Sequence, residues 1–137
     1  MYRNIAVPVD LEHVDRLEKA LATAADLGKH YNAEVCYIGV TTTEPSPLGH
    51  TPDEYAQSLA EFGRQQAAKH GIETTTLART ARDLSIDLDK ILLKAISESG
   101  ADAVVMASHV PGLADHFFAS NAGTVASDAK ISVFVIR

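Results

Sequence analysis

Apolar positions recur along this chain with two periods, and each change of period marks a predicted element. Short, nearly continuous apolar or alternating runs predict strands at about 3–9, 34–40, 72–79, 103–107 and 131–136. Apolar residues at helical spacing predict helices at about 13–30, 53–69, 84–99 and 117–129. Strands that alternate with helices favour right-handed crossovers and a mostly parallel sheet covered by helices.

The predicted strands differ in their expected burial. The first is apolar at almost every position, which is typical of a strand covered on both faces. Pro8 has no backbone N–H to donate, so it should lie near the end of that strand. The threonines of 72–79 suit an outer strand. The strand at 131–136 has no helix after it to cover its edge, and an uncovered apolar edge favours pairing with another chain.

Composition narrows the class of protein. A length of 137 residues fits one domain spanning 1–137, and 46% hydrophobic with 22% charged residues is ordinary for a globular protein. The net charge of −6, without a cluster of lysine and arginine, argues against nucleic-acid binding. No apolar run approaches the length of a membrane span, so no membrane insertion is expected. One cysteine, Cys36, in an apolar run and no signal-peptide pattern predict a cytoplasmic protein.

Polar residues that could bind a ligand lie at the end of one predicted strand and at the start of one predicted helix. Asp10 closes the first strand, where its carboxylate would accept a hydrogen bond from a sugar hydroxyl, help hold a metal ion, or cap the next helix. Ser120 and Asn121 open the last helix, where the backbone N–H groups would bind phosphate or the side chains would serve as N-caps. In parallel α/β sheets, ligands bind beyond the carboxyl ends of the strands, where the strand order reverses.

These segments carry a resemblance to a known family. Residues 5–10, Ile-Ala-Val-Pro-Val-Asp, resemble the I-L-V-P-V-D strand of the universal stress protein family. The family's V-M-[GA]-S-H motif resembles residues 105–109, Val-Met-Ala-Ser-His, and its G-S-x-A motif resembles residues 120–122, Ser-Asn-Ala. The chain also ends in a pattern similar to the family's V-x-V-[VI]-R. The resemblance extends over the whole chain. It is strongest to a small bacterial subgroup written S-H-R-P…G-S-N-A.

The resemblance implies a fold, a ligand and an assembly. The fold would be a Rossmann-like three-layer α/β sandwich with a five-stranded parallel sheet of order 3-2-1-4-5. The ligand would be ATP, or else ADP or AMP, with magnesium when it is bound, and adenine would pack near Gly39 and Val40. Homodimerisation would use the strand Val133–Ile136. The nucleotide-binding residues would be Pro8, Val9, Asp10, Val40, Met106, Ala107, Ser108, His109, Val110, Ala119, Ser120 and Asn121.

The chain departs from this family at the expected phosphate loop. Ala107, Val110 and Ala119 stand where many members carry glycine, and Val110 replaces the arginine of the subgroup. Three hypotheses follow. The first is a dimeric nucleotide-binding regulator that signals to a partner protein, and the second a dimeric interaction module that has lost the nucleotide. The third, an enzyme such as a slow ATPase or adenylyl-group transferase, lacks a catalytic motif, and the scattered histidines predict no metal site.

Overall fold

The structure is a computed structural model that describes residues 1–45, 47–108 and 121–137. Helices and strands alternate from the first strand to the last. In chain order they are β1 (Asn4–Pro8), the 3-10 helix η1 (Leu11–Leu17), α1 (Glu18–Tyr31), β2 (Glu34–Thr41), α2 (Pro52–His70), β3 (Thr74–Thr80), α3 (Leu84–Glu98), β4 (Ala103–Ala107), α4 (Asn121–Asp128) and β5 (Ser132–Ile136).

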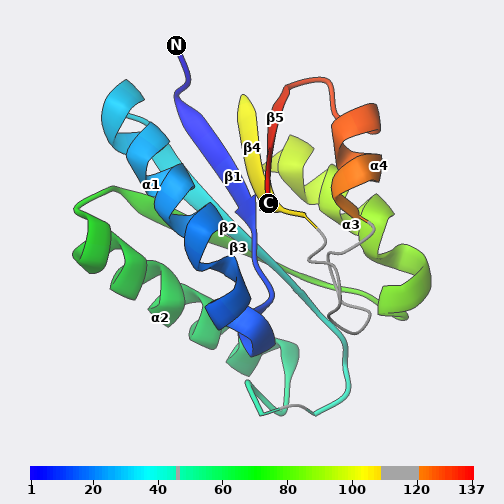
Figure 1. Ribbon diagram of the computed structural model, residues 1–137. Helices are drawn as coiled ribbons and strands as arrows, with labels where there is room; N and C mark the ends of the chain where they lie inside the picture. The colour runs from blue at the N-terminus through cyan, green and yellow to red at the C-terminus, as the bar shows by residue number, and fades with distance from the viewer. Residues whose placement is uncertain (46, 109–120) are drawn as a thin grey trace.

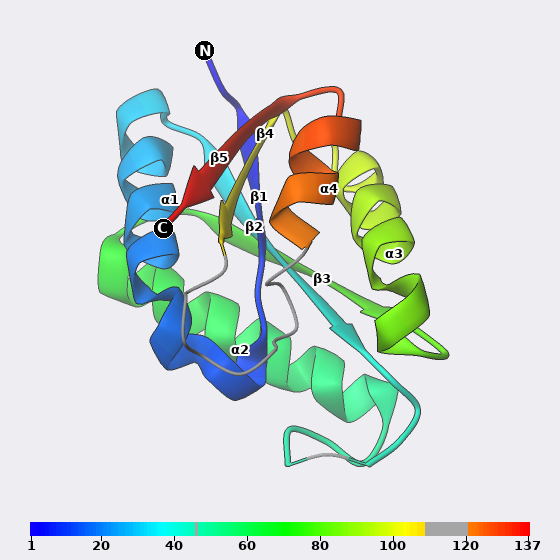
Figure 2. The ribbon, with the colours of Figure 1, turned by 45° about the vertical axis from the view of Figure 1, so that its right-hand side comes forward.

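The strands form one parallel five-stranded sheet of order β3-β2-β1-β4-β5, which confirms the predicted topology. Figures 1 and 2 show α1 and α2 on one face of the sheet and α3 and α4 on the other. β3 lies at one edge and is only partly buried, as its threonines predicted. β5 forms the opposite edge. The order reverses between β1 and β4, so the carboxyl ends of these two strands flank the switch point.

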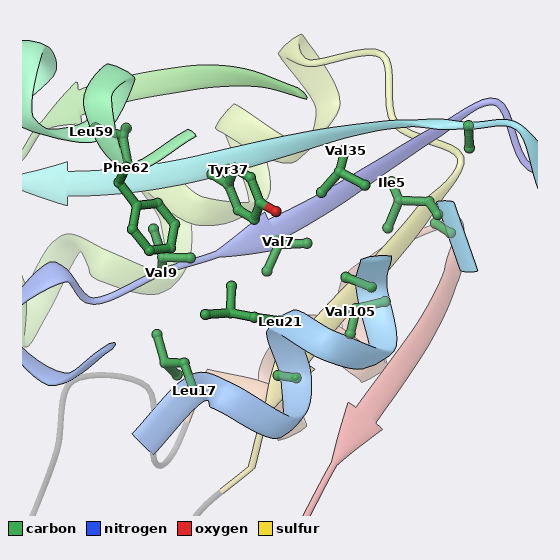
Figure 3. Packing of buried hydrophobic residues seen from close by; sticks show 14 residues of the cluster. Ile5, Val7, Val9, Leu17, Leu21, Val35, Tyr37, Leu59, Phe62 and Val105 are labelled. Carbon is green, nitrogen blue, oxygen red and sulfur yellow. The ribbon is translucent and has the colours of Figure 1, made fainter. Parts of the chain in front are cut away.

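Each face of the sheet has its own apolar core. Val7, Tyr37 and Leu59 belong to the cluster beneath α1 and α2 (Figure 3), and Leu92 and Met106 to the cluster beneath α3 and α4. All five side chains are almost fully buried. This two-sided burial explains why the sequence of the central strands is apolar at consecutive positions.

Cys36 is buried in the core, and burial raises the pKa of its thiol. Cys36 is therefore a small core residue, and its thiol, which stays protonated in this apolar site, is a poor nucleophile. Within the described residues, no helix is both long and apolar enough to cross a membrane.

The start of the first predicted helix differs from the prediction. A continuous helix was expected over 13–30, but residues 11–17 form the 3-10 helix η1, and α1 begins only at Glu18. Inside η1 the backbone of His13 is not helical, with φ −134° and ψ 41°. The physical reason lies in the hydrogen bonds of Asp10. Its side chain accepts from the Glu12 N–H and contacts the His13 ring, and its carbonyl accepts from the His13 N–H, so a regular α-helical first turn does not form. The predicted last helix is seen from Asn121, and its predicted start at 117 lies outside the described residues.

Candidate functional site

Asp10 follows β1 and caps η1. Its carboxylate Oδ1 accepts a hydrogen bond from the Glu12 N–H at 3.0 Å, and its Oδ2 lies 2.7 Å from Nδ1 of His13. The side chain is only 10% exposed, so these donors offset the cost of burying a charge. The capping role, one of the interpretations of the sequence, is thus present in the structure.

A pocket of about 230 Å³ lies beyond the carboxyl ends of β1 and β2. Asp10 and Val40 both border it, together with Tyr55 of α2 and Leu84 at the start of α3. Pockets that enclose a drug-sized ligand usually measure roughly 300–1,000 Å³. The described pocket therefore suits part of such a ligand, of about the size of a heterocyclic base.

Tyr55 forms a wall of this pocket that the sequence did not reveal. It is 5% exposed, and a Cβ placed on Gly39 would overlap its hydroxyl oxygen. Burial raises the pKa of the Tyr55 hydroxyl, and the carboxylates of Asp10 and Glu12 raise it further, so the group stays neutral. Because Tyr55 covers Gly39, the pocket is bordered by Val40 and not by Gly39. The sequence signal was weak, since an aromatic residue on an amphipathic helix usually belongs to the core.

Three predicted site residues near the switch point are buried in the sheet. Pro8 is the last residue of β1, and Val9 continues the ladder by donating its N–H to the Ile38 carbonyl at 2.8 Å. Val9 and Met106 have exposures of 0% and 1% and pack in the two cores. Their side chains therefore do not border the described pocket, and they support the site by positioning its backbone.

Ala107 ends β4, and Ser108 follows it on the other side of the switch point. The β1–β4 register pairs Ile5 with Ala103 and Ala6 with Val104, so Asp10 and Ser108 follow the carboxyl ends of neighbouring strands. The Ser108 N–H is already bound to the Ile136 carbonyl at 2.8 Å. Its Oγ is buried and has no hydrogen-bond partner among the described residues. Of the two polar groups of Ser108, the N–H is therefore paired and the hydroxyl is not, among the described residues.

The remaining predicted site residues fall mostly outside the described chain. His109, Val110, Ala119 and Ser120 lie in the undescribed segment 109–120. Asn121 is the first described residue of α4, so its backbone belongs to the first turn of that helix.

The charge of the site is negative. Asp10, Glu12 and Glu44 border the pocket, and no lysine or arginine does so among the residues described. The sequence also contains no lysine or arginine between Lys94 and Lys130. A phosphate group within this pocket would consequently depend on backbone N–H groups and hydroxyls, because no described lysine or arginine borders it.

No group of three or more His, Cys, Asp or Glu side chains able to hold a metal ion occurs in the part of the chain that the structure describes. The two donors on Asp10 occupy one position on each of its oxygens.

A larger pocket of about 670 Å³ lies between η1, residues 47–50 and α2. Its polar groups hold the adjoining segment in place: Ser58 Oγ donates to the Leu48 carbonyl at 2.7 Å, and Glu54 Oε2 accepts from the His50 N–H at 2.6 Å. We therefore centre the candidate site on the smaller pocket, which lies at the carboxyl ends of the strands and contains the buried carboxylate.

A parallel sheet of order 3-2-1-4-5 with a pocket at its carboxyl ends defines a Rossmann-like α/β protein. A model of the universal stress protein family matches residues 1–137, and the chain belongs to that family. It is 26% identical over 149 aligned residues to Universal stress protein G of Salmonella typhimurium, with 100% of both chains covered.

Solved structures share the fold. Universal stress protein UspA from Lactobacillus plantarum aligns with a TM-score of 0.70 at 18% identity, covering 99% of this chain and 98% of that one. The universal stress protein from Archaeoglobus fulgidus, in a structure described as a complex with dAMP, aligns with a TM-score of 0.68 at 21% identity, covering 99% and 98%.

Proposed function

We propose that this protein binds an adenine nucleotide at the carboxyl ends of β1 and β2 and acts as a dimeric stress-response regulator. The observation that carries the proposal is the pocket bordered by the buried carboxylate of Asp10 at the switch point of the sheet. The dAMP complex of the Archaeoglobus fulgidus protein supports an adenine ligand for this fold. The motifs around residues 107–111 and 120–122 further favour the small bacterial S-H-R-P…G-S-N-A subgroup.

The pocket offers complementary contacts for the two uncharged parts of a nucleotide. Val40 and Leu84 provide apolar surface for a base, and Asp10 provides an acceptor for a hydroxyl or amino group. Phosphate would lie toward the start of α4, where the first N–H groups of the helix lack partners within the helix. Our proposal covers ATP, ADP and AMP, and magnesium would enter with the phosphates.

Replacing Asp10 by asparagine should weaken nucleotide binding about tenfold or more, because a hydrogen bond to a charged group is worth roughly 1.5–3 kcal/mol. Isothermal titration with AMP and with ATP plus magnesium measures this change. Asp26→Asn is the matched control, since Asp26 is an exposed carboxylate on α1. Equal affinities for Asp10→Asn and the parent protein would remove Asp10 from the binding site.

The homodimer that we propose uses β5. This strand forms one edge of the sheet and pairs only with β4 among the described strands. Its residue Val135 is 41% exposed to solvent. An apolar edge with unpaired backbone groups is a template for the same strand of a second copy. Such a dimer would cover Val135 and continue the sheet across the interface or pack the two edges together.

Val135→Lys should therefore shift the protein from dimer to monomer, because the interface would have to bury a charge. Sedimentation equilibrium or light scattering after size exclusion gives the mass. Ile86→Lys, at a 76% exposed position on α3, is the control and should leave the mass unchanged. A parent protein that is monomeric at all concentrations would contradict the proposed assembly.

A second candidate function is an interaction module without nucleotide. Two observations favour it: the alanines and valine at positions 107, 110 and 119, and the lack of lysine or arginine between Lys94 and Lys130. The titration above separates the two functions. No heat and no rise in Tm at millimolar nucleotide would contradict nucleotide binding and favour the interaction module.

We further propose that the protein works in the cytoplasm, binds a regulatory protein partner and does not turn over its ligand. A coupled phosphate-release assay with Asp10→Ala as control tests the last point. Magnesium-dependent release that is lost in Asp10→Ala would instead support an enzyme.

A further inference from the structure

The carboxylate of Asp10 is held by a residue to which the family resemblance assigned no role. His13 contacts Asp10 twice: its backbone N–H donates to the Asp10 carbonyl at 3.0 Å, and its ring Nδ1 lies 2.7 Å from Oδ2. An ionised carboxylate only accepts hydrogen bonds, so Nδ1 carries the proton of this contact in either the neutral or the charged ring.

The backbone of His13 departs from helical geometry beside this contact. With φ −134° and ψ 41°, His13 interrupts η1 within its first turn. Side chains at positions i and i+3 share one face of a helix and lean toward its N-terminus, so the His13 ring can reach back to the N-cap Asp10. The sequence did not predict the non-helical backbone at His13, which lies beside the contact with the site carboxylate.

The two donors determine which way the carboxylate faces. The Glu12 N–H binds Oδ1 and the His13 ring binds Oδ2, while the carboxylate borders the pocket. Each oxygen accepts about two hydrogen bonds, and among the described residues one donor occupies one position on each. Binding is tighter when these acceptor positions are already fixed in the free protein, because less side-chain entropy is then lost on binding.

We infer that His13 is a positioning residue for the ligand site, acting through Asp10 and not by touching the ligand. This inference rests on the proposed nucleotide site. The ring is 39% exposed and does not border the described pocket, whereas Asp10 does. The class of ligand group that this arrangement recognises is a neutral hydrogen-bond donor, such as a sugar hydroxyl or an aromatic amine.

A double-mutant cycle with AMP as the titrant tests this role. His13→Leu keeps a side chain of comparable bulk and removes the donor, so Kd should rise about fivefold to tenfold, as expected for loss of a single positioning contact. His13→Asn places an amide N–H near the position of Nδ1, so its Kd should stay within about threefold of the parent value. In an Asp10→Asn background, His13→Leu should change Kd by less than about twofold, because the two residues act through one contact.

The control is His30→Leu, which removes an exposed imidazole at the other end of α1 and should leave Kd unchanged. Tm is measured for every variant, so that loss of folded protein is separated from loss of affinity. Equal Kd values for His13→Leu and the parent protein overturn the inference alone, as does an equal effect of His13→Leu with and without Asp10→Asn. A parent protein that binds neither AMP nor ATP overturns the proposed function and this inference with it.

Discussion

Replacing Leu59 by alanine is expected to lower the free energy of unfolding by about 2–5 kcal/mol, the usual cost of removing a buried leucine side chain. Leu59 is 0% exposed and lies on α2 in the cluster between the helices and the sheet (Figure 3). Its Cδ2 also lies 3.1 Å from the position of a Cβ on Gly39, so it packs directly on β2 behind the candidate pocket. The cavity left by the missing side chain would therefore weaken the core and also the packing of α2, which forms one wall of the candidate pocket.

Chemical denaturation of the parent protein and the variant measures this loss. Gln57→Ala, an exposed position on the same helix, is the control and should change the free energy of unfolding by less than about 0.5 kcal/mol. An effect of Leu59→Ala as small as that of the control would mean that α2 does not pack on β2 as the structure shows.

Replacing Gly39 by alanine is expected to destabilise the protein by about 1–3 kcal/mol, the range typical of overpacking a core. The added methyl group would overlap the Tyr55 hydroxyl and approach Tyr55 Cε1 and Leu59 Cδ2, both at 3.1 Å. The clash would be relieved by moving Tyr55 out of its place between β2 and the pocket. We therefore also expect weaker nucleotide binding from this single methyl group.

The partner substitution makes this prediction specific. Tyr55→Phe removes the overlapping oxygen, so Gly39→Ala should cost less in the Tyr55→Phe background than in the parent, and a thermal denaturation cycle gives the difference. Gly123→Ala is the control, because a Cβ there meets no atom of the described residues within 4 Å and alanine is favoured in a helix. Equal costs of Gly39→Ala in both backgrounds would show that the Tyr55 hydroxyl does not fill this space.

The prediction of the fold from the sequence succeeded where local pattern and burial agree. The central strands are apolar because both faces are covered, and the threonines of β3 belong to an edge. Gly71 and Gly100 follow the ends of two of the helices, both at positive φ, so these helix ends could be read from residue types alone. The predicted start of the first helix was wrong, because Asp10 and His13 form a contact that helical periodicity does not report.

What the sequence alone determined was the family-like order of elements, the two-sided core and the position of Asp10 after β1. These properties depend on period, residue type and neighbours along the chain. The tertiary structure alone decided that Tyr55 covers Gly39, that His13 binds Asp10, and that the Ser108 N–H is used by β5 while its hydroxyl stays unpaired among the described residues. Tyr55 with Gly39, and Ser108 with β5, join distant segments, and packing in three dimensions selects such contacts, which no single segment encodes. The contact of His13 with Asp10 is local, but helical periodicity does not report which side chains bond to a cap residue.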